Sequence, residues 1–287
     1  MGRQRDRVVK PGARAGSTAR ASWLRCAAIT VDTLSRLDLA FCVDLTGSMG
    51  GFIQAAREHM VSILDALRAP LGDGLRVAIV GYRDHCDAKT CEVHPFERDP
   101  RAVKATLDGL AVMGGGDYPE AVFTGLSSCL DLPWRTGAYR VVVLVGDAPP
   151  HACGAAGDTH ARRDPSGLDL DEMANRLEEA GVFVHALAMT APGRADVEPV
   201  LDRAFRRLSI STGGQFHDAR GAAAAMEIVD TIGRRFLADI AFDRRLFEVL
   251  ERAADADVEA IAKALRTTAP EVNAGMMRLR QRKLIGA

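Results

Sequence analysis

The feature that most constrains this chain is an alternation of short apolar runs with longer stretches of helical periodicity, which begins at Leu37. The runs are nearly continuous in Val, Ile, Leu, Phe and Ala, as expected for strands buried on both faces of a parallel sheet. The four strongest runs are 37–43, 76–82, 139–146 and 182–189. A weaker run at 215–217 would close one edge of the sheet, and 84–96 has room for a short edge strand.

Between these runs, apolar residues recur at helical spacing. The helical segments are 51–67, 102–110, 120–129, 169–180, 197–211 and 222–238. Strands and helices in alternation predict an α/β fold with a doubly wound, mostly parallel, Rossmann-like sheet of six strands and helices on both faces.

The chain of 287 residues is long enough for one α/β domain and a small appendage. Residues 1–34 are rich in Arg and have no apolar period, which predicts a disordered basic tail. The α/β domain is expected over 35–239. After it the strand and helix alternation stops, and 240–287 is predicted to form a small all-α module.

Charge and composition restrict the partners and the compartment. The formal net charge of -1 gives no whole-molecule field toward nucleic acid or membrane. The sequence contains no apolar run of about 18 residues and no signal peptide, so we expect no membrane partner. Six cysteines are too few for a disulfide scaffold in a chain of this size, which predicts a cytoplasmic protein.

The first strand leads directly into Asp44-Leu45-Thr46-Gly47-Ser48. One carboxylate and two hydroxyls therefore share a tight turn at the carboxyl end of a buried strand, where open α/β sheets bind ligands. Oxygen donors of this kind suit a hard cation such as Mg²⁺.

Two more loops are expected at the same edge of the sheet. The glycine-rich loop 114–120 contains Asp117, and Asp147 follows the run 139–146. The sequence thus predicts a convergent site for Mg²⁺, with Mn²⁺ or Ca²⁺ as alternatives. Its expected ligands are Asp44, Thr46, Ser48, Asp117 and Asp147.

These motifs resemble the metal-ion-dependent adhesion site (MIDAS) of von Willebrand factor type A domains, over 37–238. Gly-Gly-Gly-Asp-x-Pro-Glu at 114–120 and Gly-Tyr-Arg-Asp-His at 81–85 resemble the intracellular form that accompanies alpha-type protein kinases. The resemblance implies that Thr46 and Ser48 bind the ion directly. It also implies that Asp44 and Asp147 hold the ion through water or as hydrogen-bond acceptors, which leaves one coordination position for a partner.

Asp117 stands where many members of the family have a Thr. Three carboxylates around a divalent ion leave a formal site charge of about -1. Such an ion would attract a partner's Asp or Glu more weakly than a site that carries Thr.

Other chemistry has less support in the sequence. Ser48 could be a nucleophile with His85 or His151 as base, but the strained Gly-x-Ser-x-Gly turn is absent, so we predict no enzymatic activity. The glycine-rich loop lacks the Lys-Ser/Thr ending of a nucleotide site. A Zn²⁺ site is a less favoured alternative, because the spacing of its potential ligands fits no regular zinc motif. These residues are Cys86, Cys91, His94, His151 and Cys153.

The segment 258–285 resembles a helix-turn-helix of the winged-helix kind. Thr268 is the expected cap of its second helix and Pro270 an early helical residue. The expected buried stripe is Val272, Met276 and Leu279. Four basic residues that could bind DNA phosphates are Arg278, Arg280, Arg282 and Lys283. Packing without DNA binding is the alternative.

The sequence therefore predicts a non-catalytic, intracellular module that binds a protein partner through a divalent ion, with the partner offering a carboxylate to that ion. Two alternatives are a transcription regulator that binds DNA through 240–287, and a non-catalytic adaptor subunit of an ATPase or chelatase assembly.

Overall fold

The computed structural model describes residues 30–190, 198–253 and 256–286. Its centre is one six-stranded sheet with the strand order β3-β2-β1-β4-β5-β6. The strands are β1 (Leu37–Asp44), β2 (Leu75–Tyr82), β3 (Cys91–Glu97), β4 (Tyr139–Gly146), β5 (Val182–Met189) and β6 (Phe216–Ala219). Only β3 is antiparallel to its neighbour in this sheet. The expected mostly parallel six-stranded sheet is confirmed, and both weak segments are its edge strands.

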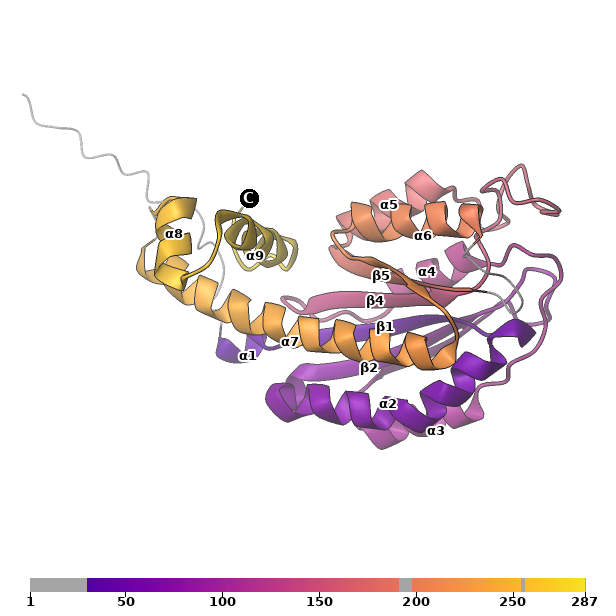
Figure 1. Cartoon of the computed structure of the whole chain (residues 1–287), viewed down its shortest axis with the longest axis horizontal. Coiled ribbons are helices and arrows are strands. Elements are labelled where there is room, and N and C mark those ends of the chain that lie inside the picture. The colour runs from indigo at the N-terminus through magenta and orange to yellow at the C-terminus, as the bar shows by residue number, and fades with distance from the viewer. Residues whose placement is uncertain (1–29, 191–197, 254–255, 287) are drawn as a thin grey trace, which may run out of the picture.

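Helices cover both faces of the sheet, as the alternation predicts (Figure 1). One face carries α2 (Gly50–Leu71), α3 (Pro100–Gly109) and α7 (Ala222–Arg252). The other face carries α4 (Val122–Leu130), α5 (Leu170–Glu179) and α6 (Pro199–Ser211). Three further described helices are α1 (Val31–Leu34), α8 (Val258–Leu265) and α9 (Ala269–Gln281).

β1 shows why the sequence from Leu39 to Val43 is apolar. Successive side chains of a strand point to opposite faces of a sheet. Leu39 and Phe41 pack in the core beneath α2 and α7, whereas Ala40 and Cys42 pack beneath α4 and α5. Both faces are covered, so every residue of the strand is buried.

The strand order places a topological switch point beside β1. From β1 the chain moves outward to β2 and β3 on one side, and it then returns to form β4 on the other side of β1. Such a reversal opens a crevice at the carboxyl ends of the two strands between which it occurs. The loops after β1 and β4 meet at this point.

The C-terminal helices are joined to the sheet by one long helix. α7 runs unbroken from Ala222 to Arg252 and crosses the boundary predicted between 239 and 240. Its first part packs on the sheet, with Phe236 buried there. Its second part contributes Leu246 and Leu250 to a smaller core with α8, α9 and Leu34. The structure therefore shows no linker at the predicted boundary, since α7 belongs to both cores.

The details of α9 and α1 test two more expectations. Thr268 caps α9 and forms a capping box with Glu271, as the position of the turn predicts. The expected stripe is buried, and it consists of Val272, Met276 and Leu279. The predicted tail 1–34 lies outside the described residues as far as residue 29. Its last part forms α1 and buries Leu34, so the tail prediction is wrong for 31–34.

Candidate metal centre

Asp44 ends β1 at the switch point and has no exposed surface. Its Oδ1 accepts hydrogen bonds from the backbone nitrogen of Thr46 at 2.8 Å and from Thr46 Oγ1 at 2.6 Å. Its Oδ2 is buried and accepts no hydrogen bond. A short 3₁₀ turn, Gly47–Met49, follows at once and connects this loop to α2.

Ser48 links the loop after β1 to the loop after β4. Its Oγ lies 3.3 Å from Thr46 Oγ1 and donates to Asp147 Oδ1 at 3.1 Å. Asp147 is largely buried, whereas Ser48 is exposed. The structure therefore brings together four of the five predicted ligands, with Ser48 on the solvent side.

The carboxyl groups here are costly to ionise. Burial, together with the charge of Asp147, raises the pKa of Asp44 to about 7 although the hydrogen bonds from Thr46 oppose the shift. Burial also raises the pKa of Asp147. Glu120 is 4% exposed, and burial plus the charges of Asp44 and its acidic neighbours raise its pKa to about 10. The ionised forms of these acids are therefore disfavoured unless a cation lies beside them.

The arrangement fits a divalent cation. Thr46 and Ser48 offer hydroxyl oxygens, and Asp44 and Asp147 offer carboxylate oxygens, which are the donors that Mg²⁺, Mn²⁺ and Ca²⁺ take in proteins. The buried, unpartnered Oδ2 of Asp44 is an acceptor for which a cation or its bound water would compensate.

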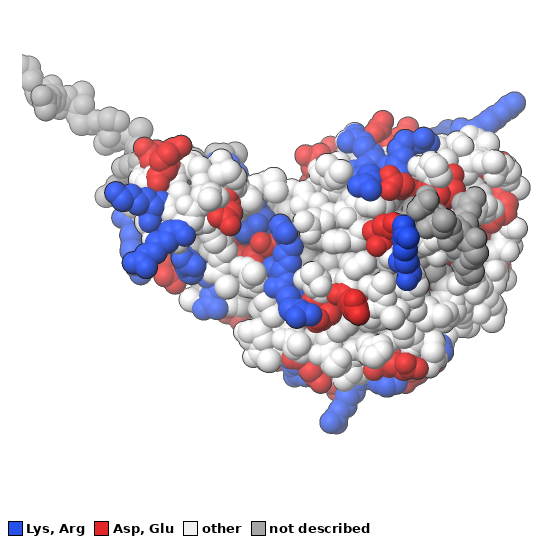
Figure 2. Space-filling model, viewed as in Figure 1, with Lys and Arg blue, Asp and Glu red and all other residues white. Residues whose placement is uncertain are grey.

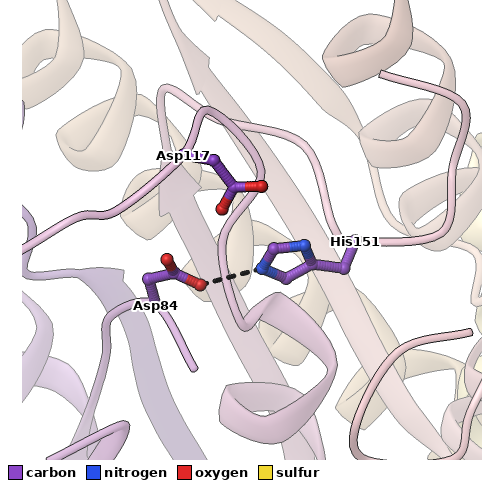
Figure 3. Close-up of side chains that lie close together, drawn as sticks. All are labelled: Asp84, Asp117 and His151. Carbon is purple, nitrogen blue, oxygen red and sulfur yellow. Dashed lines mark hydrogen bonds and ion pairs between the residues drawn. The ribbon is translucent and has the colours of Figure 1, made fainter. Parts of the chain in front are cut away.

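Asp117 does not belong to this group of contacts. Its Oδ2 accepts a hydrogen bond from the backbone nitrogen of Thr159 at 2.6 Å. Its carboxylate lies with Asp84 and His151, and one ligand atom from each of these three lies within 4.8 Å of the other two (Figure 3). Gly114 and Gly115 have positive φ values, and these residues turn the loop that carries Asp117. The sequence predicts Asp117 beside Asp44, whereas the structure places it beside Asp84 and His151.

Three acidic residues near the site were missed as candidates. Glu120 ends the glycine-rich loop, Asp87 accepts a hydrogen bond from the backbone nitrogen of Gly115 in that loop, and Asp84 follows β2 at the same edge. The sequence does contain a signal for Asp84, because this residue lies shortly after the end of β2, as Asp147 does after β4. No comparable signal marks Glu120, whose burial depends on a backbone pairing with Pro149 and Pro150.

The cysteine-containing zinc set is not assembled. Within residues 30–190, 198–253 and 256–286, the only group of three His, Cys, Asp or Glu side chains close enough to share an ion is Asp84, Asp117 and His151. Cys91 donates instead to Ser128 Oγ at 3.3 Å. Of the residues in the predicted zinc set, His151 alone belongs to a ligand group.

The predicted DNA-binding face needs a correction. Arg278 and Arg282 are 7% and 4% exposed, so they are not free to bind phosphates. Arg278 pairs with Asp243 at 2.6 Å, and Arg282 donates to the carbonyl oxygen of Leu34 at 2.9 Å. Arg280 and Lys283 are exposed. Figure 2 shows acidic and basic side chains interspersed on the face in view, over the C-terminal helices as elsewhere.

No helix among the described residues is long and apolar enough to cross a lipid bilayer.

Comparisons with known proteins agree with this architecture. Residues 38–153 match the family model for the von Willebrand factor A domain. Alpha-protein kinase vwkA of Dictyostelium discoideum is 30% identical over 141 residues, which are 48% of this chain and 23% of the kinase. A putative ariadne-like RING finger protein, R811 of Acanthamoeba polyphaga mimivirus, is 30% identical over 151 residues, 52% of this chain and 14% of that protein. The chain thus spans less than a quarter of either relative.

A solved structure shows the same fold. The pilus adhesin SpaC from Lactobacillus rhamnosus GG, in its open conformation, superposes with a TM-score of 0.54 at 16% identity, over 72% of this chain and 30% of the adhesin. The chain contains a von Willebrand factor A domain, similar to the one in an alpha-type protein kinase. Domains of this family are protein-interaction and adhesion modules.

Proposed function

We propose that this chain is a non-catalytic, intracellular interaction module that binds a protein partner through a divalent metal ion. The ion would be held by Asp44, Thr46, Ser48 and Asp147. The observation that carries this proposal is the buried Asp44 Oδ2, which lacks a partner beside two hydroxyls and a second carboxylate. An intracellular setting is supported by the five described cysteines, all of which are free thiols.

The charge of the site favours an acidic partner group. With Asp117 turned away, two carboxylates and two neutral hydroxyls surround the ion, so the formal charges of ligands and ion cancel. A neutral site attracts a carboxylate better than the negatively charged site expected with Asp117 as a third acid. Ser48 faces solvent, which leaves the open side of the ion accessible to an Asp or Glu of the partner.

A comparison of captured proteins tests this function. The native chain is immobilised in Mg²⁺ and in chelator, beside Asp44→Asn and the control Asp65→Asn, which changes an exposed acid of α2. We expect to recover proteins that bind the native chain and the control variant in Mg²⁺. The same proteins should not bind the native chain in chelator, and they should not bind Asp44→Asn. Binding of a purified partner should follow the same order. Equal recovery in all four conditions would contradict the proposal.

A further inference from the structure

A second group of potential ligands lies at the carboxyl-end edge of the sheet and includes Asp117 of the glycine-rich loop. Asp84 follows β2, Asp117 belongs to the loop 114–120, and His151 follows β4. Asp84 is 2% exposed and His151 has no exposed surface. The three side chains converge on one space (Figure 3), although they come from three separate loops.

His151 is held in one orientation by an acid outside this group. Its Nδ1 lies 2.8 Å from Asp158 Oδ1, and Asp158 also accepts from the backbone nitrogens of Ala152 and His160. A carboxylate in this position fixes the ring and leaves Nε2 as the donor atom toward a metal. His151 Nε2 lies 2.9 Å from Asp84 Oδ1, a distance that fits either a proton on Nε2 or a metal ion bound to both atoms.

Asp117 supplies an unused acceptor. Its Oδ2 is occupied by Thr159, but its Oδ1 is buried and has no hydrogen-bond partner. A buried carboxylate oxygen without a donor is costly unless a cation compensates for it. A proton shared by His151 and Asp84 would leave this oxygen unsatisfied, whereas a metal ion could bind all three side chains.

The glycine-rich loop 114–120 comes close to Asp84 because it has glycine at position 116. Gly116 donates its backbone N–H to Asp84 Oδ2 at 3.2 Å. A Cβ atom at position 116 would stand 2.5 Å from that oxygen and 2.4 Å from Cys86 Sγ. Only glycine lets the backbone beside Asp117 come this near to Asp84.

We propose that Asp84, Asp117 and His151 form a second metal site, which binds a transition-metal ion such as Zn²⁺ and is distinct from the site at Asp44. The imidazole ligand separates the two sites chemically, because nitrogen donors favour Zn²⁺ and related ions over Mg²⁺. The ion would tie the loops after β2 and β4 to the glycine-rich loop, whose Gly115 lies against Thr46. This inference does not depend on the interaction proposed above.

Metal titration of the full chain tests the inference. The native protein, Asp117→Asn and Asp44→Asn are stripped with chelator and titrated with Zn²⁺, and then with Co²⁺ to give a visible absorption spectrum. Asn at 117 keeps an oxygen for the Thr159 N–H, so this variant is expected to fold. The expected result is one Zn²⁺ equivalent in the native chain and in Asp44→Asn, and at least about tenfold weaker Zn²⁺ binding in Asp117→Asn.

Two further variants and one spectrum complete the test. Asp158→Asn, which changes the residue that positions His151, should weaken Zn²⁺ binding by about 10- to 100-fold. His151→Gln should abolish the nitrogen-ligated Co²⁺ spectrum. The inference is overturned if Asp117→Asn binds Zn²⁺ as the native chain does, or if the Zn²⁺ equivalent is lost in Asp44→Asn instead. It is equally overturned if ¹⁵N NMR finds His151 Nε2 protonated in the Zn²⁺-saturated protein.

Discussion

Asp44 is the residue on which the proposed metal site at the end of β1 depends. One of its oxygens accepts two hydrogen bonds from Thr46, and the other is buried without a partner. Without a cation, the charge on this side chain is opposed by burial and by Asp147. Asp44 should therefore destabilise the metal-free protein and stabilise the metal-loaded one.

The difference in stability between Asp44→Asn and the native chain should change when metal is added. In chelator the variant should be at least as stable as the native chain, because Asn removes a buried charge beside Asp147. In Mg²⁺ at about 100 times its dissociation constant, the native chain alone should gain about 2.7 kcal/mol. Chemical denaturation in both conditions measures this difference. An equal Mg²⁺ effect on both proteins would show that Asp44 is not a ligand.

His185 should make stability depend on pH. Burial, together with the nearby His217 and Arg235, lowers the pKa of His185 to about 3, and its Nδ1 has no hydrogen-bond partner. Below about pH 6.5 the unfolded chain binds a proton here that the folded chain does not. Stability therefore falls with decreasing pH, by up to about 1.4 kcal/mol per unit.

His185→Gln should reduce this slope between pH 6.5 and pH 5, measured by urea denaturation at each pH, and the half-buried His217, whose pKa is also lowered, should supply the remainder. The slope is the readout, so a general loss of stability in the variant does not affect the result. His59→Gln, which changes an exposed histidine of α2, is the control and should keep the native slope. A native slope in His185→Gln would assign the pH dependence to other groups.

At the residue scale, the sequence predicts side chains at strand ends better than side chains on loops. Asp44 is the last residue of β1 and Asp147 directly follows β4, and both strands are mostly apolar, so the meeting of the two residues follows from the parallel sheet. Asp117 lies on a loop whose path depends on the positive φ of Gly114 and Gly115. Residue type alone does not determine that path, so Asp117 is found beside His151.

At the element scale, helices α7 and α9 are joined by a buried network of charges. Arg278 of α9 contacts Asp243 Oδ1 at 2.6 Å and Asp239 Oδ1 at 3.2 Å. Arg282 Nη1 lies 3.6 Å from Asp243 Oδ2. A sequence pattern alone predicts that an Arg faces solvent. Arg278 is buried because it pairs with Asp243 of α7, which lies 35 residues earlier in the chain.

Arg278→Met should destabilise the fold by about 3–5 kcal/mol, because Asp243 then remains buried with a weaker partner. The matched control is Arg280→Met on the same helix, where an exposed side chain should cost less than about 0.5 kcal/mol. Adding Asp243→Leu to Arg278→Met should recover part of the loss. Equal denaturation midpoints for the two Arg variants would refute a stabilising role for this network.

The predicted elements agree with the structure where the apolar pattern is strong. β1, β4 and β5 begin and end within one residue of the predicted runs, because strands buried on both faces have continuous apolar sequence. β3 is less distinct in sequence, since it is an edge strand with an exposed Val93. The end of α7 was missed because its apolar period continues past residue 240 into a different core.

At the scale of the whole molecule, the sheet and the C-terminal helices share structure. α7 extends from the sheet to α8 and α9 (Figure 1) and belongs to both cores. Arg282 of the C-terminal part donates to the carbonyl oxygens of Gly137 and Leu34. Loss of the small core should therefore weaken the large one. The two parts are expected to unfold as one unit.

Leu246→Ala tests this coupling from the small core. Leu246 has no exposed surface, so its truncation should cost about 2–5 kcal/mol. In a Trp23→Phe background, the fluorescence of Trp134, which packs against the core on the α4 and α5 face of the sheet, should shift to a lower denaturant midpoint together with the helical signal. Met277→Ala, at a side chain that is 40% exposed, should shift neither. An unchanged Trp134 midpoint in Leu246→Ala would indicate two independent units.

The most direct test of the metal-dependent function is a crystal structure of the full chain grown with Mn²⁺ and measured for anomalous scattering. We expect a Mn²⁺ peak at the end of β1, with Thr46 Oγ1 and Ser48 Oγ at roughly 2.0–2.3 Å and Asp44 and Asp147 beside it. Asp44→Asn crystals should lack that peak. A native structure in saturating Mn²⁺ with no peak near Thr46 and Ser48 would contradict the account.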